Sequence, residues 1–507
     1  MSVARARSVA LLGIEGYLVE VEADLSQGLP KLVITGLPDT ALGQARDRLR
    51  AAVTNSGEGW PTSRITVNLS PASVRKQGSG FDVAMAVAIL QAAGVLPAGA
   101  LRDTVLVGEL ALDGRIRTVR GVLPAVLAAS RAGIGRVVVP AGNAAEARLV
   151  SADLRVVGVD NLADLLAMLR GTLEIPDEPA PEVDPDQDSG LDLADVVGQP
   201  DGRAAVEIAA AGGHHLAMVG PPGSGKTMLA ERMPGLLPPL SEHESLEVTA
   251  VHSIAGVLPP DCALIRRPPY QAPHHTTTMP ALVGGGAGLA RPGALSLAHR
   301  GVLFLDEAPE FPRGVLESLR QPLERGQVQI SRAAGIVTYP SRVQLVVAAN
   351  PCPCASPRGD ALCTCPAATR RRYLRKISGP LLDRIDLQVK LLPVRPGALL
   401  GPTDQLESSA AVRERVRLAR EAAADRWRPY GWATNADVPG PSLRQNFRLP
   451  RSVRRTLDMA FENGALSARG YDRVLRISWT VCDLAGRTMP AGDDVDQAVE
   501  LRTGKAA

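Results

Sequence analysis

The sequence has few aromatic residues, few cysteines and almost no excess of charge of either sign. Aromatic residues make up 3% of its 507 residues, which predicts an aliphatic, alanine-rich core. Any nucleic-acid surface would therefore depend on charge more than on base stacking. The formal net charge of +3 is too small to indicate a polyanionic partner, so only a local cationic patch would do so. The length predicts more than one domain, and the overall composition is that of a soluble globular protein.

The sequence also lacks an apolar run long enough to cross a membrane. The longest uncharged run, VAMAVAILQAAGVLPAGAL, starts at Val83. Its glycines and proline interrupt it after about three helical turns, whereas a spanning helix needs about 20 apolar residues, so we predict a buried core helix. We predict no signal peptide, because no cleavage site follows the first short apolar run and Glu15, Glu20 and Glu22 come directly after it. These features predict a cytoplasmic protein without a membrane partner, in which cysteines stay reduced.

Lysine and arginine are absent from residues 171–202, and part of this stretch, EIPDEPAPEVDPDQDSG, is acidic and rich in proline. Such a segment buries too little apolar surface to fold, so we interpret it as a linker. On both sides, short β-rich runs such as RITVNL and GVLFLD alternate with helical patterns, which predicts α/β units. Beyond about Arg413 the pattern is mostly helical. The predicted organisation is an N-terminal α/β domain over 1–170, a linker over 171–194, a second α/β unit over 195–395 and a helical unit over 396–507.

The most specific motif is a glycine-rich loop between a predicted strand, HLAMVG, and a helical pattern. Glycines let backbone N–H groups turn inward around phosphate oxygens, and the following helix adds the positive end of its dipole. In this motif Lys226 reaches the β- and γ-phosphates of ATP, and Thr227 holds Mg²⁺. A chance glycine-rich turn is the alternative, but strand, loop and helix are in register. The loop fits G-x-x-x-x-G-K-[ST] and consists of Gly220, Pro221, Pro222, Gly223, Ser224, Gly225, Lys226 and Thr227.

A second apolar strand, GVLFL, ends in Asp306 and Glu307. A buried strand that delivers carboxylates in this way is typical of Mg²⁺ sites in ATPases. We therefore assign Asp306 to the metal and Glu307 to the activation of the attacking water as a general base. A third strand, VQLVVAAN, ends in Asn350, whose amide would position that water. The acidic pair is a weak signal alone and becomes specific in combination with the loop at Gly220.

These motifs and their order resemble those of the AAA+ ATPases. DVVGQ at 195–199 precedes the loop, Asn350 matches the position called sensor 1, and SGPLLDRID resembles the segment that carries the arginine finger. The resemblance implies that Arg384 reaches the γ-phosphate bound by a neighbouring subunit of a ring. SARGYDRVLR resembles the sensor 2 helix and implies that role for Arg469, with Arg476 as the second choice. Without the shared order of motifs, each arginine would be equally well explained as a solvated charge on a helix.

More narrowly, nearly the whole chain resembles the ComM/YifB group of magnesium-chelatase-like AAA+ proteins. The most specific stretches are QAPHHTTTMPALVGGGAGLARPGALSLAHRGVLFLDEAPEF and LESLRQPLERGQVQISRA. They resemble the helix 2 insert region and the hairpin before sensor 1. The resemblance implies a hexameric ring that hydrolyses ATP on DNA and promotes branch migration in recombination or natural transformation. His274 and His275 lie in this region without a set of metal ligands, so we expect them to pack a loop or contact DNA.

The N-terminal unit resembles the Lon proteolytic domain, which has a ribosomal S5 domain 2-like fold. GVLPAVLAASRAGIGRVVVP is similar to the helix that bears the Lon lysine, yet no lysine lies at residues 123–125. Lon proteases carry their serine in a G-P-S-A-G turn, whereas the turn here reads QGSGFD, with Ser79 one place early. The resemblance therefore implies a Lon-like scaffold without the Ser/Lys dyad. Lys76 is a further candidate base, although a surface charge is the favoured interpretation.

Four of the six cysteines form a C-x-C-x8-C-x-C pattern directly after Asn350. Four thiolates suit a tetrahedral Zn²⁺ site, although C-x-C is tighter than the usual spacing of zinc ligands. A reducing compartment disfavours disulfides, while a redox pair and free thiols stay open as alternatives. We favour structural zinc that folds an insertion of the ATPase core. The isolated Cys262 and Cys482 fit buried, small hydrophobic positions. The four clustered cysteines are Cys352, Cys354, Cys363 and Cys365.

The candidates for DNA contact are arginines of two segments. Arg332 and Arg342 flank a predicted hairpin, QVQISRAAGIVTYPSR, and Arg370, Arg371 and Arg372 begin the basic stretch RRRYLRK. Such groups neutralise phosphates in DNA-binding proteins, but a solvated helix face explains the second segment equally well.

Two other functions stay open at this point. A magnesium-chelatase subunit would couple ATP to the insertion of a metal into a porphyrin. The Lon-like unit and the cysteine cluster argue against that assignment. An ATP-dependent protease is disfavoured, because the Ser/Lys dyad is missing.

Overall fold

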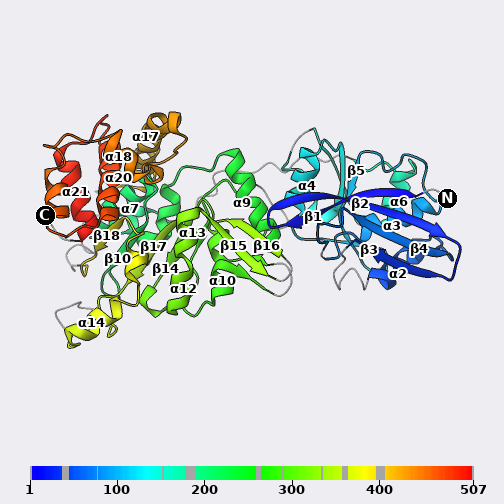
Figure 1. The fold of residues 1–507 in the computed structure, drawn as a ribbon, viewed down its shortest axis with the longest axis horizontal. Helices are drawn as coiled ribbons and strands as arrows, with labels where there is room; N and C mark the ends of the chain where they lie inside the picture. The colour runs from blue at the N-terminus through cyan, green and yellow to red at the C-terminus, as the bar shows by residue number, and fades with distance from the viewer. Residues whose placement is uncertain are drawn as a thin grey trace.

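The computed structural model describes residues 3–36, 45–76, 78–150, 153–176, 190–258, 264–286, 290–332, 335–356, 363–394 and 406–504. Cys262 and the middle of the predicted linker, 177–189, lie outside the described residues. The described chain is elongated, with the N-terminal unit at one end, an α/β core in the middle and a helical unit at the other end (Figure 1). In the described part of the chain, no helix is long and apolar enough to cross a membrane.

The N-terminal unit is built on a seven-stranded mixed sheet with the order β3-β4-β2-β1-β5-β8-β9. β1 pairs antiparallel with β2, and β2 with β4, whereas the strands at the two edges pair in parallel. Along β2 every second residue of the central part is buried, which places an apolar face against the helices. The seven strands are β1 Ala4–Leu12, β2 Glu15–Ser26, β3 Lys31–Thr35, β4 Arg64–Ser70, β5 Thr104–Leu106, β8 Arg136–Pro140 and β9 Arg155–Val159; β6 Glu109–Leu110 and β7 Ile116–Arg117 form a separate antiparallel pair.

Helix α3 is the core helix that the apolar run at Val83 predicts. Its first nine residues, from Asp82 to Leu90, are all buried. An apolar segment of this length is covered by the sheet and by other helices, so the prediction of a buried helix is confirmed. The helices of this unit are α2 Ala45–Asn55, α3 Asp82–Ala92, α4 Val122–Arg131, η1 Ala141–Asn143, α5 Ala144–Ala147 and α6 Leu162–Leu169.

The core contains a five-stranded parallel sheet with the order β11-β14-β17-β10-β18. Every residue of β14 and β17 is buried, as expected for parallel strands that helices cover on both faces. The strands are β10 Leu216–Val219, β11 Tyr270–Gln271, β14 Val302–Leu305, β17 Gln344–Ala349 and β18 Leu387–Lys390, and two small pairs are β12 Gly284–Gly285 with β13 Arg291–Pro292 and β15 Gln327–Arg332 with β16 Gly335–Pro340. The helices are η2 Leu193–Asp195, α7 Pro200–Gly212, α8 Lys226–Arg232, η3 Met233–Leu236, α9 Glu242–Ala255, α10 Met279–Val283, α11 Ala294–Leu297, η4 Ala308–Glu310, α12 Arg313–Ser318, α13 Arg320–Arg325, α14 Ala367–Leu374 and α15 Gly379–Leu382.

The C-terminal unit is helical, as the sequence predicts. Trp427 is its largest fully buried side chain and packs edge-on against Trp479 and Phe447. Because α17 and α20 also pack on α7, this unit shares one hydrophobic core with the α/β sheet. Its helices are α17 Ser409–Trp427, η6 Arg428–Tyr430, η7 Asn435–Asp437, α18 Gly440–Gln445, α19 Arg455–Glu462, α20 Ala468–Leu484 and α21 Gly492–Thr503.

The N-terminal unit contacts the core through α4 and α9. The Ser253 hydroxyl of α9 donates a hydrogen bond to the Glu146 carboxylate, which also accepts the Leu123 backbone N–H at 2.8 Å. Burial raises the pKa of Glu146, although these hydrogen bonds oppose the shift. The two units therefore meet at a polar contact that is shielded from water.

Lys76 differs from the expectation of a surface charge. Its side chain is fully buried, and its ammonium donates to the Pro71 carbonyl. Burial lowers the pKa of Lys76, because it disfavours the charged form. The Ser79 hydroxyl donates instead to the Glu109 carboxylate. Thus the structure pairs Ser79 with an acid rather than with a lysine.

Candidate nucleotide site

The glycine-rich loop connects β10 to α8, at the carboxyl end of the strand. Gly223 and Gly225 have φ values of 76° and 82°, a left-handed backbone that residues with a side chain rarely adopt. The Lys226 ammonium donates to the carbonyls of Gly220 at 2.8 Å and Pro221 at 2.9 Å. Burial lowers the pKa of Lys226, while the nearby Asp306 and Glu307 act in the opposite direction. The loop thus concentrates positive charge at the start of α8.

The residues predicted at three strand ends lie together. β10, β14 and β17 run parallel, so the loop, the acidic pair and Asn350 all fall on the same edge of the sheet. The Thr227 hydroxyl donates a 2.9 Å hydrogen bond to the Asp306 carboxylate. The Lys226 ammonium lies 3.2 Å from the amide oxygen of Asn350, which is buried. These contacts assemble a hydroxyl, a carboxylate, a cation and an amide around one point.

Glu307 occupies a strained position in this group. Its φ is 49° and its ψ is 42°, a left-handed conformation that is uncommon for residues other than glycine. Glu307 follows the fully buried strand β14 by two residues, and its side chain is half exposed. Strained backbone of this kind clusters at functional sites, because the surrounding structure must hold it in place. The position suits a carboxylate that acts on a molecule outside the fold.

His275 approaches Glu307, a contact that sequence reasoning missed. Its Nδ1 lies 3.7 Å from the Glu307 carboxylate, and its ring packs against that of His274 with centroids 4.0 Å apart. The pairing of β11 with β14 brings the two segments together. Only this strand pairing could have indicated the contact, because 32 positions separate the residues in the sequence.

The DVVGQ segment covers the loop from outside. The Asp195 carboxylate accepts a 2.7 Å hydrogen bond from Arg232 of α8, and Gln199 donates to the Leu392 carbonyl at 2.6 Å. A Cβ atom at Gly225 would lie 3.9 Å from both Val196 and Gln199. The segment therefore packs on the loop and fixes it between η2 and the end of β18.

Arg384 and Arg469 lie at the opposite edge of the sheet. Arg384 precedes β18, and the loop of Lys226 follows β10, its parallel neighbour. Since both strands have four residues, the two edges are about 13 Å apart at about 3.3 Å per residue. Arg384 and Arg469 line one cavity of about 440 Å³ together with Arg473 and Arg476. The structure thus brings the two predicted arginines together, but not with Lys226 of the same chain.

The four clustered cysteines converge. The Cys352 sulfur lies 3.2 Å from that of Cys354 and 3.3 Å from that of Cys363, and all four sulfurs lie within 4.8 Å of one another. A tetrahedral Zn²⁺ with Zn–S bonds of about 2.3 Å requires sulfurs about 3.8 Å apart. The donor set and its spacing therefore fit a zinc ion. Cys482, in contrast, is buried in the helical unit, which confirms that prediction.

The arginines suggested for DNA contact form two separate groups. Arg332 ends β15 of the predicted hairpin, which the structure confirms, and Arg342 follows β16; both are exposed. Arg371 and Arg372 are exposed on α14, and Arg370 is partly buried there. Figure 1 shows α14 well separated from the hairpin along the molecule. Contact with DNA stays a prediction for both groups.

Three family models match the chain. The model described as magnesium chelatase, subunit ChlI, matches residues 192–399. The model of subunit ChlI of Mg-chelatase matches 21–143, and that of the ChlI C-terminal region matches 406–502. Together they cover the N-terminal unit, the core and the helical unit.

Several relatives are similar over nearly their full length. The chain is 55% identical over 502 residues to an uncharacterized protein of Mycobacterium tuberculosis, covering 99% of both chains. It is 41% identical to the competence protein ComM of Haemophilus influenzae, covering 96% of this chain and 94% of the relative. It is 39% identical to YifB of Escherichia coli, covering 99% and 97%. A partial match, 31% identical over 33% of this chain and 21% of the relative, is to Lon protease 3 of Sorangium cellulosum.

The chain therefore belongs to the ComM/YifB group of the magnesium-chelatase-like AAA+ ATPase family. Its fold is the expected one: a Lon-like α/β unit, a parallel-sheet ATPase core with a cysteine cluster, and a helical C-terminal unit.

Proposed function

We propose that this protein is an ATP-hydrolysing ring motor that acts on DNA and promotes branch migration in recombination or natural transformation. The observation that carries the ATPase part is the meeting of Lys226, Thr227, Asp306 and Asn350 at one sheet edge. The similarity to a competence protein supports the DNA part. The exposed arginines of the hairpin and of α14 supply groups that would neutralise phosphates.

In this proposal each residue of the nucleotide site has one role. Lys226 binds the β- and γ-phosphates, and the loop N–H groups bind phosphate oxygens. Thr227 and Asp306, already hydrogen-bonded to each other, would hold Mg²⁺, which neutralises phosphate charge when bound. Glu307 takes the proton of the attacking water, and Asn350 orients that water.

Arg384 and Arg469 act on the ATP of a neighbouring subunit. Their place at the edge opposite Lys226 supports this, since neither reaches the loop of its own chain across the sheet. A guanidinium at the γ-phosphate stabilises charge that develops during transfer. A closed ring, which we propose to be a hexamer, is the arrangement that supplies every site with such a neighbour.

The cysteine cluster would hold a structural Zn²⁺ through Cys352, Cys354, Cys363 and Cys365. The ion would neutralise thiolate charge and fold an insertion between β17 and α14. No catalytic step requires it.

The decisive experiment measures ATP hydrolysis without DNA and with single-stranded DNA, duplex DNA and a four-way junction, each at two salt concentrations. The proposal predicts stimulation by DNA that weakens with salt, with the largest effect for the junction. The variant Lys226→Ala controls for contaminating ATPases. An equal rate in all four conditions would contradict the DNA part of the proposal.

A magnesium-chelatase-type subunit is the second candidate, and the three family matches favour it. It predicts stimulation by a protein partner and none by DNA. An ATP-dependent protease is disfavoured, because α4 carries Leu123, Pro124 and Ala125 where a lysine would be needed.

A further inference from the structure

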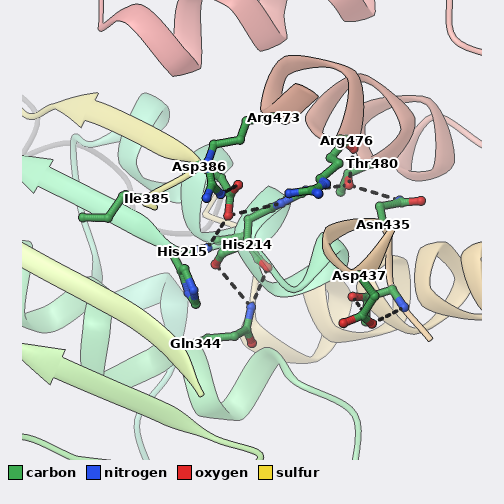
Figure 2. A network of polar contacts seen from close by, with 12 residues as sticks. His214, His215, Gln344, Ile385, Asp386, Asn435, Asp437, Arg473, Arg476 and Thr480 are labelled. Atoms are coloured by element: carbon green, nitrogen blue, oxygen red, sulfur yellow. Dashed lines mark hydrogen bonds and ion pairs between the residues drawn. The ribbon is translucent and has the colours of Figure 1, made fainter. Parts of the chain in front are cut away.

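Arg473 of α20 holds the segment that carries Arg384. We call residues 383–386 the finger loop; it lies between α15 and β18. The Arg473 Nε donates to the Asp383 carbonyl at 2.7 Å, and its Nη1 donates to the Asp386 carboxylate. Figure 2 shows Arg473 beside Asp386 at this edge of the sheet. One planar guanidinium therefore binds the residue before Arg384 and the second residue after it.

Asp386 ties the finger loop to β10 as well. The carboxylate is 3% exposed and accepts the His215 backbone N–H at 3.0 Å, directly before that strand (Figure 2). The His214 Nδ1 lies 3.7 Å away, and its Nε2 is 2.8 Å from the Thr480 hydroxyl of α20. Burial alone would raise the pKa of Asp386, but Arg473 and His214 hold it well below its usual range. The carboxylate therefore stays charged and needs its cation.

A second arginine holds the same loop from another helix. Arg502 of α21 donates to the Ile385 carbonyl and lies 3.7 Å from the Asp383 carboxylate. The Arg384 side chain itself bonds to the Pro380 carbonyl at 2.6 Å and to the Glu324 carboxylate. The backbone of the finger loop is thus fixed by the helical unit, whereas the Arg384 guanidinium has partners in the core.

An ion pair with a purely structural role would require only a positive charge beside Asp386. Arg473 does more, because its two donors bind on either side of Arg384. A fork of this kind sets orientation, and a lysine cannot reproduce it. A misplacement of a reacting group by about 1 Å costs about 10²-fold in rate. A residue that fixes the position of the finger loop therefore affects the rate of phosphoryl transfer.

We propose that Arg473 is a positioning residue that places Arg384 for ATP hydrolysis in the site of a neighbouring subunit. The inference rests on the proposed function, in which Arg384 acts across the subunit interface. In this role, Arg473 connects the helical unit of one subunit to ATP hydrolysis in the site of the neighbouring subunit. Arg473 has no contact with nucleotide in this role and acts only through the finger loop.

The test uses full-length Arg473→Ala alone and mixed with Glu307→Gln chains. Alone, Arg473→Ala is expected to lose about 10²-fold in kcat with little change in KM for ATP. In mixed rings, a site with Glu307 of the first variant faces an intact finger loop of the second. Hydrolysis should therefore rise at least about tenfold above either variant alone. Arg473→Lys should restore only part of the rate.

Three controls separate the outcomes. Arg384→Ala mixed with Glu307→Gln must recover in the same way, and its failure would overturn the proposed function rather than this inference. Recovery of that mixture without recovery of the Arg473→Ala mixture would overturn the inference alone. Full rescue by Arg473→Lys would also overturn it, since charge would then suffice. Arg444→Ala removes an arginine of α18 that pairs with Asp472, the neighbour of Arg473 on α20, and should keep the wild-type rate.

Discussion

The Arg384 guanidinium forms an ion pair with the Glu324 carboxylate of its own chain. The Arg384 side chain is 13% exposed and that of Glu324 is 53% exposed, and both residues line the cavity that Arg469, Arg473 and Arg476 also line. Glu324 belongs to α13, which ends one residue before Gly326 and the β15–β16 hairpin. If Arg384 exchanged Glu324 for a phosphate, α13 would lose this contact close to the start of the hairpin proposed to contact DNA.

Glu324→Gln should raise hydrolysis in the absence of DNA and reduce the further stimulation by DNA. The carboxylate competes with phosphate for Arg384, and the amide competes less. A partly exposed ion pair is worth about 0.2–1 kcal/mol, so the basal rate should rise by up to about fivefold. Steady-state ATPase assays with and without junction DNA measure both effects. Glu421→Gln, which affects a pair with Arg417 on α17, is the matched control; equal rates in the two variants would contradict a restraining role.

Glu307→Gln should bind ATP normally and turn it over slowly. Loss of the general base costs about 10²–10⁴-fold in kcat, whereas the phosphate contacts of Lys226 and the loop remain. A fluorescent ATP analogue measures affinity, and phosphate release measures turnover. Wild-type turnover by this variant would show that another group is the general base. Asn350 could not be that group, because an amide does not take up a proton.

We predict that the burial of a neutral His215 makes the folded protein less stable in acid. Burial lowers the pKa of His215 to about 4, and its Nδ1 accepts the Leu345 N–H, so the folded state holds the neutral ring. The unfolded chain takes up a proton near its ordinary pKa of about 6.5, so stability is full above that value and falls as pH drops towards about 4. Since the residue is not wholly buried, the loss between about pH 7.5 and pH 5 should be about 1–2 kcal/mol.

Urea unfolding at the two pH values measures this loss. His215→Asn keeps an acceptor and cannot titrate, so its free energy of unfolding should change less over the same range. An identical pH dependence in both proteins would assign the acid sensitivity to other buried groups, such as His252 and His299, whose pKa values burial also lowers.

The cysteine cluster predicts about one Zn²⁺ per chain in purified protein. Cys352→Ser should lower the zinc content and the melting temperature, because the insertion loses its clip. Elemental analysis and thermal unfolding give the two readouts. Cys482→Ser changes a buried cysteine outside the cluster and should keep its zinc. Folded, active and metal-free wild-type protein would contradict the zinc assignment.

The residues at the carboxyl edge of the sheet could be predicted because local patterns place them. Each of the residues Gly220, Asp306 and Asn350 directly follows an apolar strand. If these strands are parallel, all three residues must lie at the carboxyl edge of the sheet. The buried helix at Val83 and the β15–β16 hairpin follow from equally local signals.

The remaining contacts depend on segments that are distant in the sequence. The burial of Lys76, the approach of His275 to Glu307 and the hold of Arg473 on the finger loop each require the folded arrangement. The role of Arg473 could not be predicted, because α20 carries several arginines and the sequence alone does not show which of them faces β18. The opposite placement of Arg384 and Lys226 depends on the parallel pairing of β18 with β10, which no local pattern indicates.

The two arginine groups proposed to contact DNA can be distinguished by the salt dependence of binding. Each phosphate contact removed should lower the slope of log K against log salt by about 0.7–0.9. Arg332→Ala tests the hairpin and Arg372→Ala tests α14, and both side chains are exposed. Arg313→Ala removes an exposed arginine paired with Glu317 on α12 and should leave the slope unchanged. Because α14 and the hairpin lie far apart (Figure 1), a short single strand should show the change for only one of the first two variants. If the slope were unchanged for both variants with every DNA, neither group would contact DNA, and the DNA-binding surface would have to lie elsewhere on the protein.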